Sequence, residues 1–359
     1  EWGNSLIRGW QEGWMEMSTR IGGKIAGLVG AREDEILVCD ATSINLFKLA
    51  MAALNYRKGK YRIISDELNF PSDLYVLKGI VDLLGAPYML EQIKSGDFQS
   101  ITPKSIRNAI DNKTALLSFT HTYFKSSYLQ DMKAITEIAH EFDAMILWDL
   151  SHSVGSVPVE LNACKVDLAV GCTYKYLNGG PGSPAFLYVR KDLQDKLNQP
   201  IQGWLGSATP FEFGTEYISA DGITRFQVGT PSILSMSAIE PGLDLHLKAG
   251  MDALREKSLL QTEYLIALFD EWLAPLGFSL GSPRDPALRG SHVAIQHPVA
   301  EEITEGLIKG ENGSARVIPD FRQPDNIRLG IAPIYNSFED VFLGLYRIKE
   351  LTEKIVESL

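Results

Sequence analysis

Short apolar runs alternate with amphipathic segments between about residue 30 and residue 200 of the chain. Each run ends at polar or turn-forming residues, as buried strands do, and the segments between them have apolar residues at helical spacing. This alternation predicts an α/β fold with a mixed, mostly parallel sheet that is covered by helices on both faces. The predicted strands are residues 35–40, 62–65, 115–120, 144–149, 168–172 and 186–189. The predicted helices include residues 44–54 and 132–141, and helices that begin at Pro71 and Pro103.

The pattern changes after residue 200, where loops rich in glycine precede a long amphipathic helix that ends at Pro275 and Gly277. Strands follow at residues 293–295 and 327–331, and a capping-box pattern at Ser337 and Asp340 predicts the last helix. We therefore expect two domains, a large one and a smaller α+β one that also includes an N-terminal helical segment. The expected bounds are 30–239 for the large domain, 240–359 for the small domain and 1–29 for the helical segment.

Composition and charge exclude several classes of function. The 359 residues are 45% hydrophobic and 22% charged, which is typical of a soluble globular protein. A net charge of −11 argues against nucleic acid or an anionic membrane as a partner. No apolar run approaches the length that spans a membrane. The three cysteines lack metal-site spacing and favour reduced thiols in a cytoplasmic protein. Because the sequence starts at Glu1 within a helical pattern, we expect residues upstream of it.

An aspartate and a lysine stand at the ends of two predicted strands. Asp149 follows the apolar run 144–148, and Lys175 follows the run 168–172. A carboxylate at the end of a buried strand is costly unless a cation faces it. One interpretation is a simple salt bridge between the two. The other is pyridoxal 5'-phosphate (PLP) chemistry, in which the lysine forms a Schiff base and the aspartate keeps the pyridine nitrogen protonated.

PLP chemistry also requires a phosphate site, and the chain has one possible location for it. Thr42 and Ser43 lie between a predicted strand and a predicted helix, where they are either an ordinary N-cap or part of a phosphate site. Ligands of open parallel sheets bind at the carboxyl ends of the strands. The residues at or just after predicted strand ends are Thr42, Phe70, Thr120, Asp149 and Lys175.

Several motifs resemble the kynureninase family, and the resemblance runs over essentially the whole chain. The block at residues 174–182 is the most specific one. The weaker matches are residues 69–73, 148–153, 203–204 and 290–293, and Arg328 with residues 333–335. The resemblance implies the aspartate-aminotransferase fold (fold type I) and a homodimer with shared active sites. It also implies the PLP-dependent hydrolysis of kynurenine to anthranilate and alanine, in tryptophan catabolism and NAD biosynthesis.

The resemblance also implies a role for individual residues. Lys175 would form the Schiff base and remove the Cα proton, and Asp149 would be the partner of the pyridinium. Tyr174 is our candidate for the general acid/base, and Arg328 for the clamp of the substrate carboxylate. Phe70 would stack on the cofactor. The remaining implied cofactor contacts are Asp73 and His152 near the ring, Thr42, Ser43 and Tyr174 at the phosphate, and Trp204 and Thr230, which reach the phosphate across the dimer interface.

The sequence departs from the family pattern in three places. Ser207 replaces an expected histidine, residues 122–127 differ, and residues 309–317 form a longer loop. These departures affect the expected substrate preference and not the expected cofactor. They leave open whether kynurenine or 3-hydroxykynurenine is preferred.

Three of these residues also have a purely structural interpretation, and the chain has alternative functions. Without the resemblance, His152 is interpreted as a structural histidine, Arg328 as a surface ion pair and Trp204 as a packing residue. The rival functions are a cysteine desulfurase, a class V aminotransferase, and a binding protein of the same fold that has lost catalysis.

Overall fold

The structure is a computed structural model that describes residues 2–310 and 316–358. Its larger part is built on a seven-stranded sheet with the strand order β1-β7-β6-β5-β4-β2-β3. Strand β7 pairs antiparallel with both of its neighbours, and the other pairs are parallel. The strands are β1 (Ile36–Val38), β2 (Arg62–Asp66), β3 (Met89–Ile93), β4 (Thr114–Thr120), β5 (Met145–Asp149), β6 (Leu168–Gly171) and β7 (Phe186–Val189).

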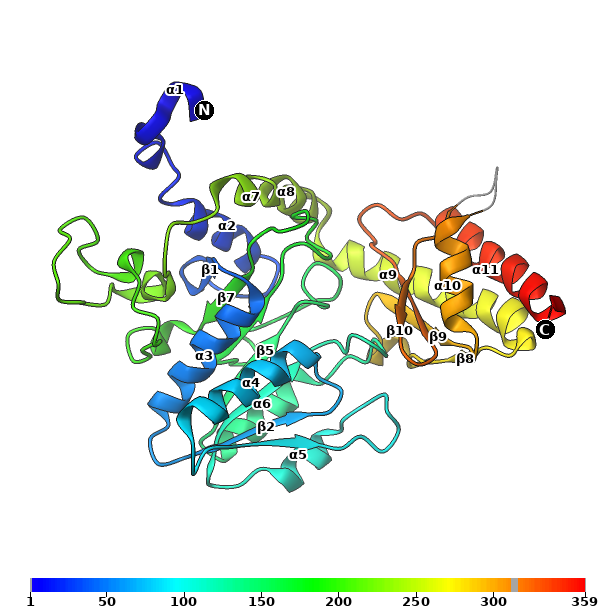
Figure 1. Cartoon of the computed structure of the whole chain (residues 1–359), viewed down its shortest axis with the longest axis horizontal. Helices are drawn as coiled ribbons and strands as arrows, with labels where there is room; N and C mark the ends of the chain where they lie inside the picture. Colours follow the sequence, from blue (N-terminus) through cyan, green and yellow to red (C-terminus); the bar gives the residue numbers. More distant parts are fainter. Residues whose placement is uncertain (1, 311–315, 359) are drawn as a thin grey trace.

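Helices cover both faces of this sheet, which confirms the predicted α/β class (Figure 1). Successive residues of β5 point to opposite faces, because strand side chains alternate. Ile146 and Trp148 therefore belong to one apolar core, and Met145 and Leu147 to the other. The helices are α2 (Met17–Ala26), α3 (Thr42–Tyr56), α4 (Pro71–Leu84), α5 (Pro103–Ala109), α6 (Met132–Glu141), α7 (Ile233–Ser237) and α8 (Ile239–Ala249).

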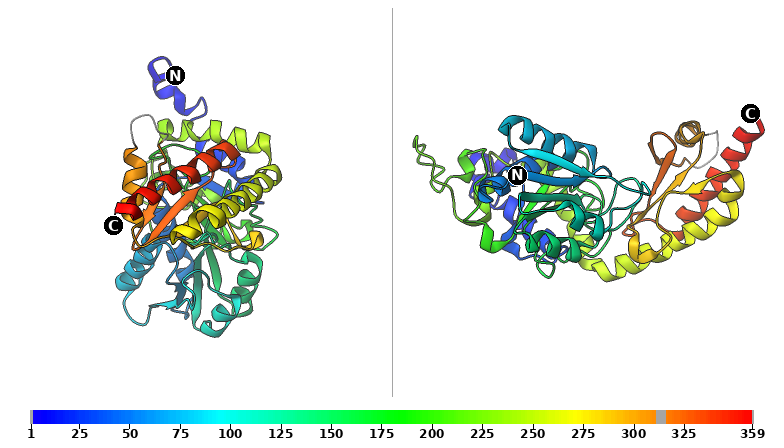
Figure 2. Two further views of the ribbon diagram at one scale, coloured as in Figure 1. Left: turned by 90° about the vertical axis from the view of Figure 1, so that its right-hand side faces the viewer. Right: turned by 90° about the horizontal axis from the view of Figure 1, so that it is seen from below.

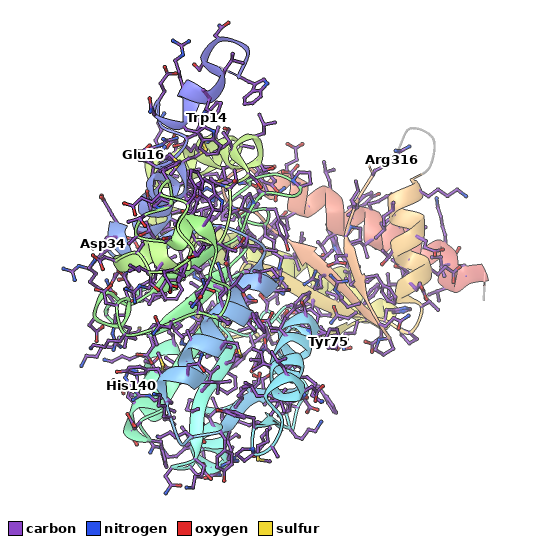
Figure 3. All side chains as sticks on the ribbon, turned by 60° about the vertical axis from the view of Figure 1, so that its left-hand side comes forward. Trp14, Glu16, Asp34, Tyr75, His140 and Arg316 are labelled. Atoms are coloured by element: carbon purple, nitrogen blue, oxygen red, sulfur yellow. The ribbon has the colours of Figure 1, made fainter. Side chains whose placement is uncertain are left out.

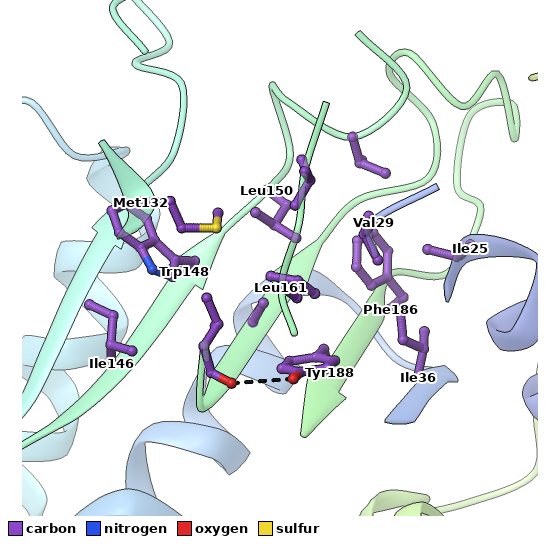
Figure 4. Close-up of a cluster of buried hydrophobic side chains, with 14 of the residues drawn as sticks. Ile25, Val29, Ile36, Met132, Ile146, Trp148, Leu150, Leu161, Phe186 and Tyr188 are labelled. Atoms are coloured by element: carbon purple, nitrogen blue, oxygen red, sulfur yellow. Dashed lines mark hydrogen bonds between the residues drawn. The ribbon is translucent and has the colours of Figure 1, made fainter. Parts of the chain in front are cut away.

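Figure 4 shows one of these two cores, in which Trp148 and Tyr188 lie among aliphatic side chains. The ring of Tyr188 is fully buried, yet its hydroxyl donates to the carbonyl oxygen of Val166 at 3.2 Å. Ile25 and Ile36 close the same core from α2 and β1. The core therefore joins the N-terminal helix firmly to the large sheet.

A second, four-stranded antiparallel sheet has the order β10-β11-β9-β8 and forms a separate unit (Figure 2). Its apolar core lies between the sheet and three helices. Helix α9 extends from the larger part into this unit. The elements are α9 (Met251–Leu268), β8 (Ser279–Leu280), β9 (His292–Gln296), α10 (Ala300–Lys309), β10 (Asp320–Arg322), β11 (Asn326–Gly330) and α11 (Phe338–Ser358).

The N-terminal segment is helical only in part. It is not one helix, because α1 (Trp2–Ser5) is followed by a 3₁₀ turn, and Gly13 has a φ of +117° that no α-helix accommodates. Helix α2 packs on β1 and on α8, and the assignment of this segment to the small domain stays a prediction. Figure 3 shows Trp14 at the base of the projecting N-terminal end, far from Arg316 in the smaller unit. The domain boundary at residue 240 stays a prediction.

In the described part of the chain, no helix combines the length and the apolar character needed to cross a membrane.

Candidate active site

Two neighbouring cavities lie at the carboxyl ends of the large sheet's strands. The first cavity has a volume of about 440 Å³ and lies within the larger part. The second cavity, of about 340 Å³, is lined by residues of both parts. Tyr174 and Lys175 line both cavities, because they follow β6 at the centre of the sheet edge. Most of the predicted site residues line the first cavity: Thr42, Ser43, Phe70, Asp73, Asp149, Tyr174, Lys175 and Thr230.

Two buried carboxylates face the first cavity. Asp149 ends β5, is 5% exposed and accepts a hydrogen bond from the backbone N–H of Ser151 at 2.8 Å. Burial raises the pKa of Asp149, and the charge of Lys175 opposes that shift. Asp73 is 2% exposed, and its Oδ2 has no hydrogen-bond partner among the described residues. Burial and the neighbouring Asp149 raise the pKa of Asp73 well above its ordinary value. Both carboxylates therefore favour a cationic or hydrogen-bond-donating ligand in this cavity.

Lys175 is held by aromatic side chains and not by a carboxylate. Its Nζ lies 3.5 Å from Nδ1 of His152 and 5.7 Å from the centroid of the Phe70 ring. No carboxylate among the described residues lies within ion-pair distance of Nζ. The simple salt bridge with Asp149 that the sequence allowed is therefore not formed.

The start of α3 lines the first cavity. The helix begins at Thr42, two residues before the predicted start, so Thr42 and Ser43 are helical residues rather than N-caps. The N-cap is Ala41, whose side chain cannot accept a hydrogen bond, so no side chain caps the first amides of α3. The hydroxyls of Ser43 and Ser72 lie 2.9 Å apart and join the starts of α3 and α4. Free amides and hydroxyls at a helix start are suited to a phosphate group.

The second cavity is lined by a partly buried arginine and two buried histidines. Arg328 of β11 donates to the carbonyl oxygen of Phe124 at 2.6 Å and forms an ion pair with Asp320. Burial lowers the pKa of Arg328. The rings of His152 and His292 lie 5.9 Å apart. Burial and nearby positive charges, including Lys175, lower the pKa of both histidines, that of His292 to about 3, so both are neutral at physiological pH.

The sequence prediction assigned no role to several residues that line the cavities. Gln227 and Met236 line the first cavity, and Tyr176, His292 and Tyr335 line the second. Tyr176, His292 and Tyr335 belong to the matched motifs. Membership of those motifs was the available sequence signal, whereas the register that places His292 and Arg328 on neighbouring strands appears only in the structure.

Known proteins match this chain over nearly its whole length. Residues 254–346 match the model described as the kynureninase C-terminal domain, and residues 13–284 match class V aminotransferases. The chain is 41% identical to a kynureninase of Pseudomonas fluorescens, over 99% of this chain and 83% of that protein. It is 40% identical to one of Burkholderia mallei, over 98% of this chain and 83% of that protein.

The chain belongs to the kynureninase family. Its fold is also that of solved PLP enzymes. A cysteine desulfurase of Thermococcus onnurineus superimposes with a TM-score of 0.80 at 18% identity, over 96% of this chain and 85% of that one. A variant of C-DES with glycine covalently linked to its PLP cofactor superimposes with a TM-score of 0.81 at 17% identity, over 95% of this chain and 87% of that one. These likenesses show the fold alone.

Trp204 is the one residue of the predicted site that lines neither cavity. It lies in a 3₁₀ turn, is 41% exposed and packs edge-on against Phe211, with ring centroids 5.8 Å apart. Thr230 was expected to act across a dimer interface, yet it lines the first cavity of its own chain. In the described chain, therefore, only Thr230 of this pair lines a cavity.

The three departures from the kynureninase pattern differ in whether they contact a residue that lines a cavity. Residues 122–127 form the turn that supplies the Phe124 carbonyl to Arg328. Ser207 lines neither cavity and bridges to Ser219. In the longer loop, Lys309 ends α10, and residues 311–315 lie outside the described part of the chain.

Proposed function

We propose that this chain hydrolyses L-kynurenine, or its 3-hydroxy derivative, to anthranilate, or 3-hydroxyanthranilate, and L-alanine with PLP as cofactor. Membership of the kynureninase family supports this activity. The observation that carries the proposal is that Lys175 lines both cavities. One amine can therefore meet a cofactor in the first cavity and an amino acid in the second.

The residues of the first cavity fit PLP. The unpartnered Oδ2 of Asp73 and the buried Asp149 favour a ligand that brings positive charge or hydrogen-bond donors. The uncapped start of α3 suits a phosphate. Bound through Lys175, PLP supplies an electron sink for the bonds at the α-carbon of the substrate.

We assign the cofactor contacts as the family resemblance implies. Asp149 would hold the ring nitrogen, Phe70 would cover one ring face, and Thr42 and Ser43 would bind the phosphate together with Tyr174. Asp73 and His152 would lie beside the ring, and Thr230 at the phosphate. All of these residues line one of the two cavities.

Two side chains are suited to handling protons. Nζ of Lys175 would remove the proton from the α-carbon, and the neutral His152 at 3.5 Å orients that amine without adding a positive charge. The hydroxyl of Tyr174 would protonate the γ-carbonyl oxygen while water adds to that carbon. Burial raises the pKa of Tyr174 to about 12, so the hydroxyl keeps its proton at neutral pH until the reaction takes it.

Arg328 would bind the α-carboxylate of the substrate. Its guanidinium is planar and largely buried, which favours a directional hydrogen-bonded pair with a carboxylate. With the carboxylate at Arg328 and the amino nitrogen at Lys175, the α-carbon lies between the two. Water then cleaves the Cβ–Cγ bond, its oxygen leaves with the aromatic acid, and the three-carbon part is released as alanine.

The cysteines argue against desulfurase activity, which needs a reactive thiol. Cys39 and Cys172 are buried, and burial raises the pKa of Cys39 to about 11. Burial also raises the pKa values of Cys172 and Cys164. A protonated, buried thiol is a poor nucleophile.

We further propose a cytoplasmic homodimer that acts in tryptophan catabolism and NAD biosynthesis. The free cysteines suit a reducing compartment. The exposed loop with Trp204, Phe211 and Phe213 presents aromatic side chains at the surface. Such a patch is typical of an interface, and a partner subunit there would bring Trp204 to the neighbouring site.

Assays of the purified protein with added PLP test the proposal. We expect formation of anthranilate and alanine in equal amounts from L-kynurenine. A parallel assay with 3-hydroxykynurenine measures the substrate preference. Assays with cysteine and with an amino acid plus a keto acid test for desulfurase and aminotransferase activity. Faster sulfide release from cysteine, or faster transamination, would assign the chain to a rival function.

A further inference from the structure

Lys48 is a fully buried lysine beside the first cavity. It belongs to α3, its side chain is 0% exposed, and it lines neither cavity. Burying an ammonium group is costly unless the surrounding protein pairs it. The proposed hydrolysis makes no use of this amine, so its burial calls for a different role.

Three acceptors surround the ammonium group of Lys48. Its Nζ donates to Oδ2 of Asp40 at 2.6 Å, to the carbonyl oxygen of Phe226 at 2.8 Å and to Sγ of Cys39 at 3.5 Å. An ammonium group has three donors, so none of them is left for a ligand. Lys48 therefore does not bind a ligand itself, and any effect on the cavity must pass through its partners.

The partners of Lys48 belong to two walls of the first cavity. Asp40 lies just before the start of α3 and lines the cavity. Phe226 lies just before the loop 227–232, and every residue of that loop lines the cavity. Lys48 thus joins the two segments to which we assign the phosphate contacts Thr42, Ser43 and Thr230.

Asp40 places a carboxylate beside the proposed phosphate position. Its side chain is 28% exposed, and only Ala41 separates it from Thr42. Two anions this close repel each other unless a cation compensates one of them. Lys48 supplies such a cation, because its Nζ forms an ion pair with Oδ2 of Asp40 at 2.6 Å.

The backbone of Asp40 is held in place as well. Its φ is +49°, in the left-handed region that residues other than glycine adopt at a cost. Its carbonyl oxygen accepts a hydrogen bond from the amide of Ala185 at 2.8 Å, and the ion pair with Lys48 holds its side chain. The carboxylate is therefore fixed at the cavity wall, where its charge must be neutralised before an anion can bind.

We propose that Lys48 is a positioning residue for phosphate binding, which acts by neutralising the charge of Asp40 at the wall of the first cavity. With the pair intact, the free amides and hydroxyls at the start of α3 can attract a phosphate. Without Lys48, an uncompensated carboxylate would repel it. This inference rests on the proposed function, because it takes the phosphate of PLP as the anion at the start of α3.

The test is a double-substitution cycle on the ion pair with a matched control. Lys48→Met removes the cation and keeps the length of the side chain. Asp40→Asn removes the opposing charge, and asparagine tolerates the left-handed region as aspartate does. Lys60→Met is the control, because Nζ of Lys60 also donates to a carbonyl oxygen, that of Phe142 at 2.7 Å, and pairs with Asp143. Neither Lys60 nor these partners line the two cavities.

The readouts are the Kd of PLP and the Kd of inorganic phosphate, measured by calorimetry on the PLP-free protein. For Lys48→Met we expect both constants to rise about tenfold or more, as for the loss of a compensating charge beside an anion. Asp40→Asn should bind both ligands at least as tightly as wild type. The double variant should return to within about threefold of wild type, and Lys60→Met should change neither constant.

Pyridoxal, which lacks the phosphate, separates a charge effect from a general disturbance of the cavity. It should bind wild type and Lys48→Met alike. Thermal unfolding verifies that each variant is folded. An Asp40→Asn or double variant that binds phosphate about tenfold more weakly than wild type contradicts the proposal, even where Lys48→Met alone does not fold.

The outcomes separate this inference from the proposed function. If L-kynurenine is hydrolysed but the double variant binds phosphate as weakly as Lys48→Met, or if pyridoxal loses as much affinity as PLP, Lys48 is only a structural residue. If phosphate affinity follows the cycle while kynurenine is not hydrolysed, the role of Lys48 stands and the proposed function fails.

Discussion

At the scale of single residues, the site depends on which buried groups carry charge. His152 and His292 are neutral because burial and positive neighbours act in the same direction on their pKa values. Asp149 and Asp73 line the same cavity, and the charge of Asp149 adds to burial in raising the pKa of Asp73. The two carboxylates and the two neutral histidines therefore limit the charge that a bound ligand can carry.

Lys175→Ala should abolish turnover while the chain still folds and binds PLP non-covalently. The reason is that the amine is shared by both cavities and no other lysine lines either of them. Product formation and the Schiff-base absorbance band are the measurements, with thermal unfolding as the control for folding. Turnover close to that of wild type would exclude Lys175 as the reacting amine.

Arg328→Lys should raise the KM for L-kynurenine by about tenfold or more and leave the PLP affinity nearly unchanged. A lysine carries one point charge and cannot serve both the Phe124 carbonyl and a substrate carboxylate. Steady-state kinetics and a PLP titration measure the two effects. An equal loss of both would instead make Arg328 a structural residue.

Asp66 predicts a pH dependence of stability. It is fully buried, accepts a hydrogen bond from Tyr123 at 2.9 Å, and burial raises its pKa to about 7. Between about pH 4 and about pH 7 the folded chain binds a proton that the unfolded chain releases, so the free energy of unfolding falls as pH rises. The fall is about 4 kcal/mol at most. Urea unfolding across this range should show a smaller fall for Asp66→Asn, and identical profiles would contradict the assignment.

At the scale of elements, local signals determine where helices begin. The capping box at Ser337 and Asp340 is formed as predicted, with reciprocal bonds of 2.7 and 3.0 Å. Asp131 likewise caps α6 through the amide of Ala134 at 2.9 Å. A short side chain that bonds to a nearby amide needs no tertiary partner, so the sequence alone reveals it.

Ser337→Ala should destabilise the smaller unit by about 1 kcal/mol, because the amide of Asp340 loses its acceptor at the start of α11. The free energy of unfolding from urea titration measures the loss. Ser337→Thr, which keeps the hydroxyl, is the control and should remain close to wild type. A Thr variant as unstable as the Ala variant would mean that the cap bond is not the cause.

Other elements have no such local signal. The strands β3, β8 and β10 were not predicted, because they are short or lie at sheet edges and lack a continuous apolar run. The buried strands β4 and β5 were predicted almost to the residue, since both faces are covered. The candidate site shows the same contrast between local and long-range signals. Asp149 and Lys175 were predicted because each follows a predicted strand, whereas the unpaired state of Nε2 of His292 depends on long-range packing.

At the scale of the whole molecule, the proposed dimer explains the exposed position of Trp204. Trp204→Ala should weaken PLP binding about tenfold while the stability of the fold hardly changes, because the ring is 41% exposed in the single chain. PLP titration and light scattering measure affinity and mass. Phe98→Ala, which removes another exposed ring that lines neither cavity, is the control. Unchanged PLP affinity in a stable dimer would remove Trp204 from the neighbouring site.

The position of Arg328 on the small sheet has a consequence for selectivity. Lys175 and Arg328, to which we assign the reacting amine and the carboxylate clamp, belong to the two different sheets, so their spacing depends on how the two parts of the molecule pack together. A ligand must span that spacing with its own backbone. Under the proposed function, we therefore expect the two residues to select ligands by the distance between the amino and carboxylate groups that all α-amino acids share.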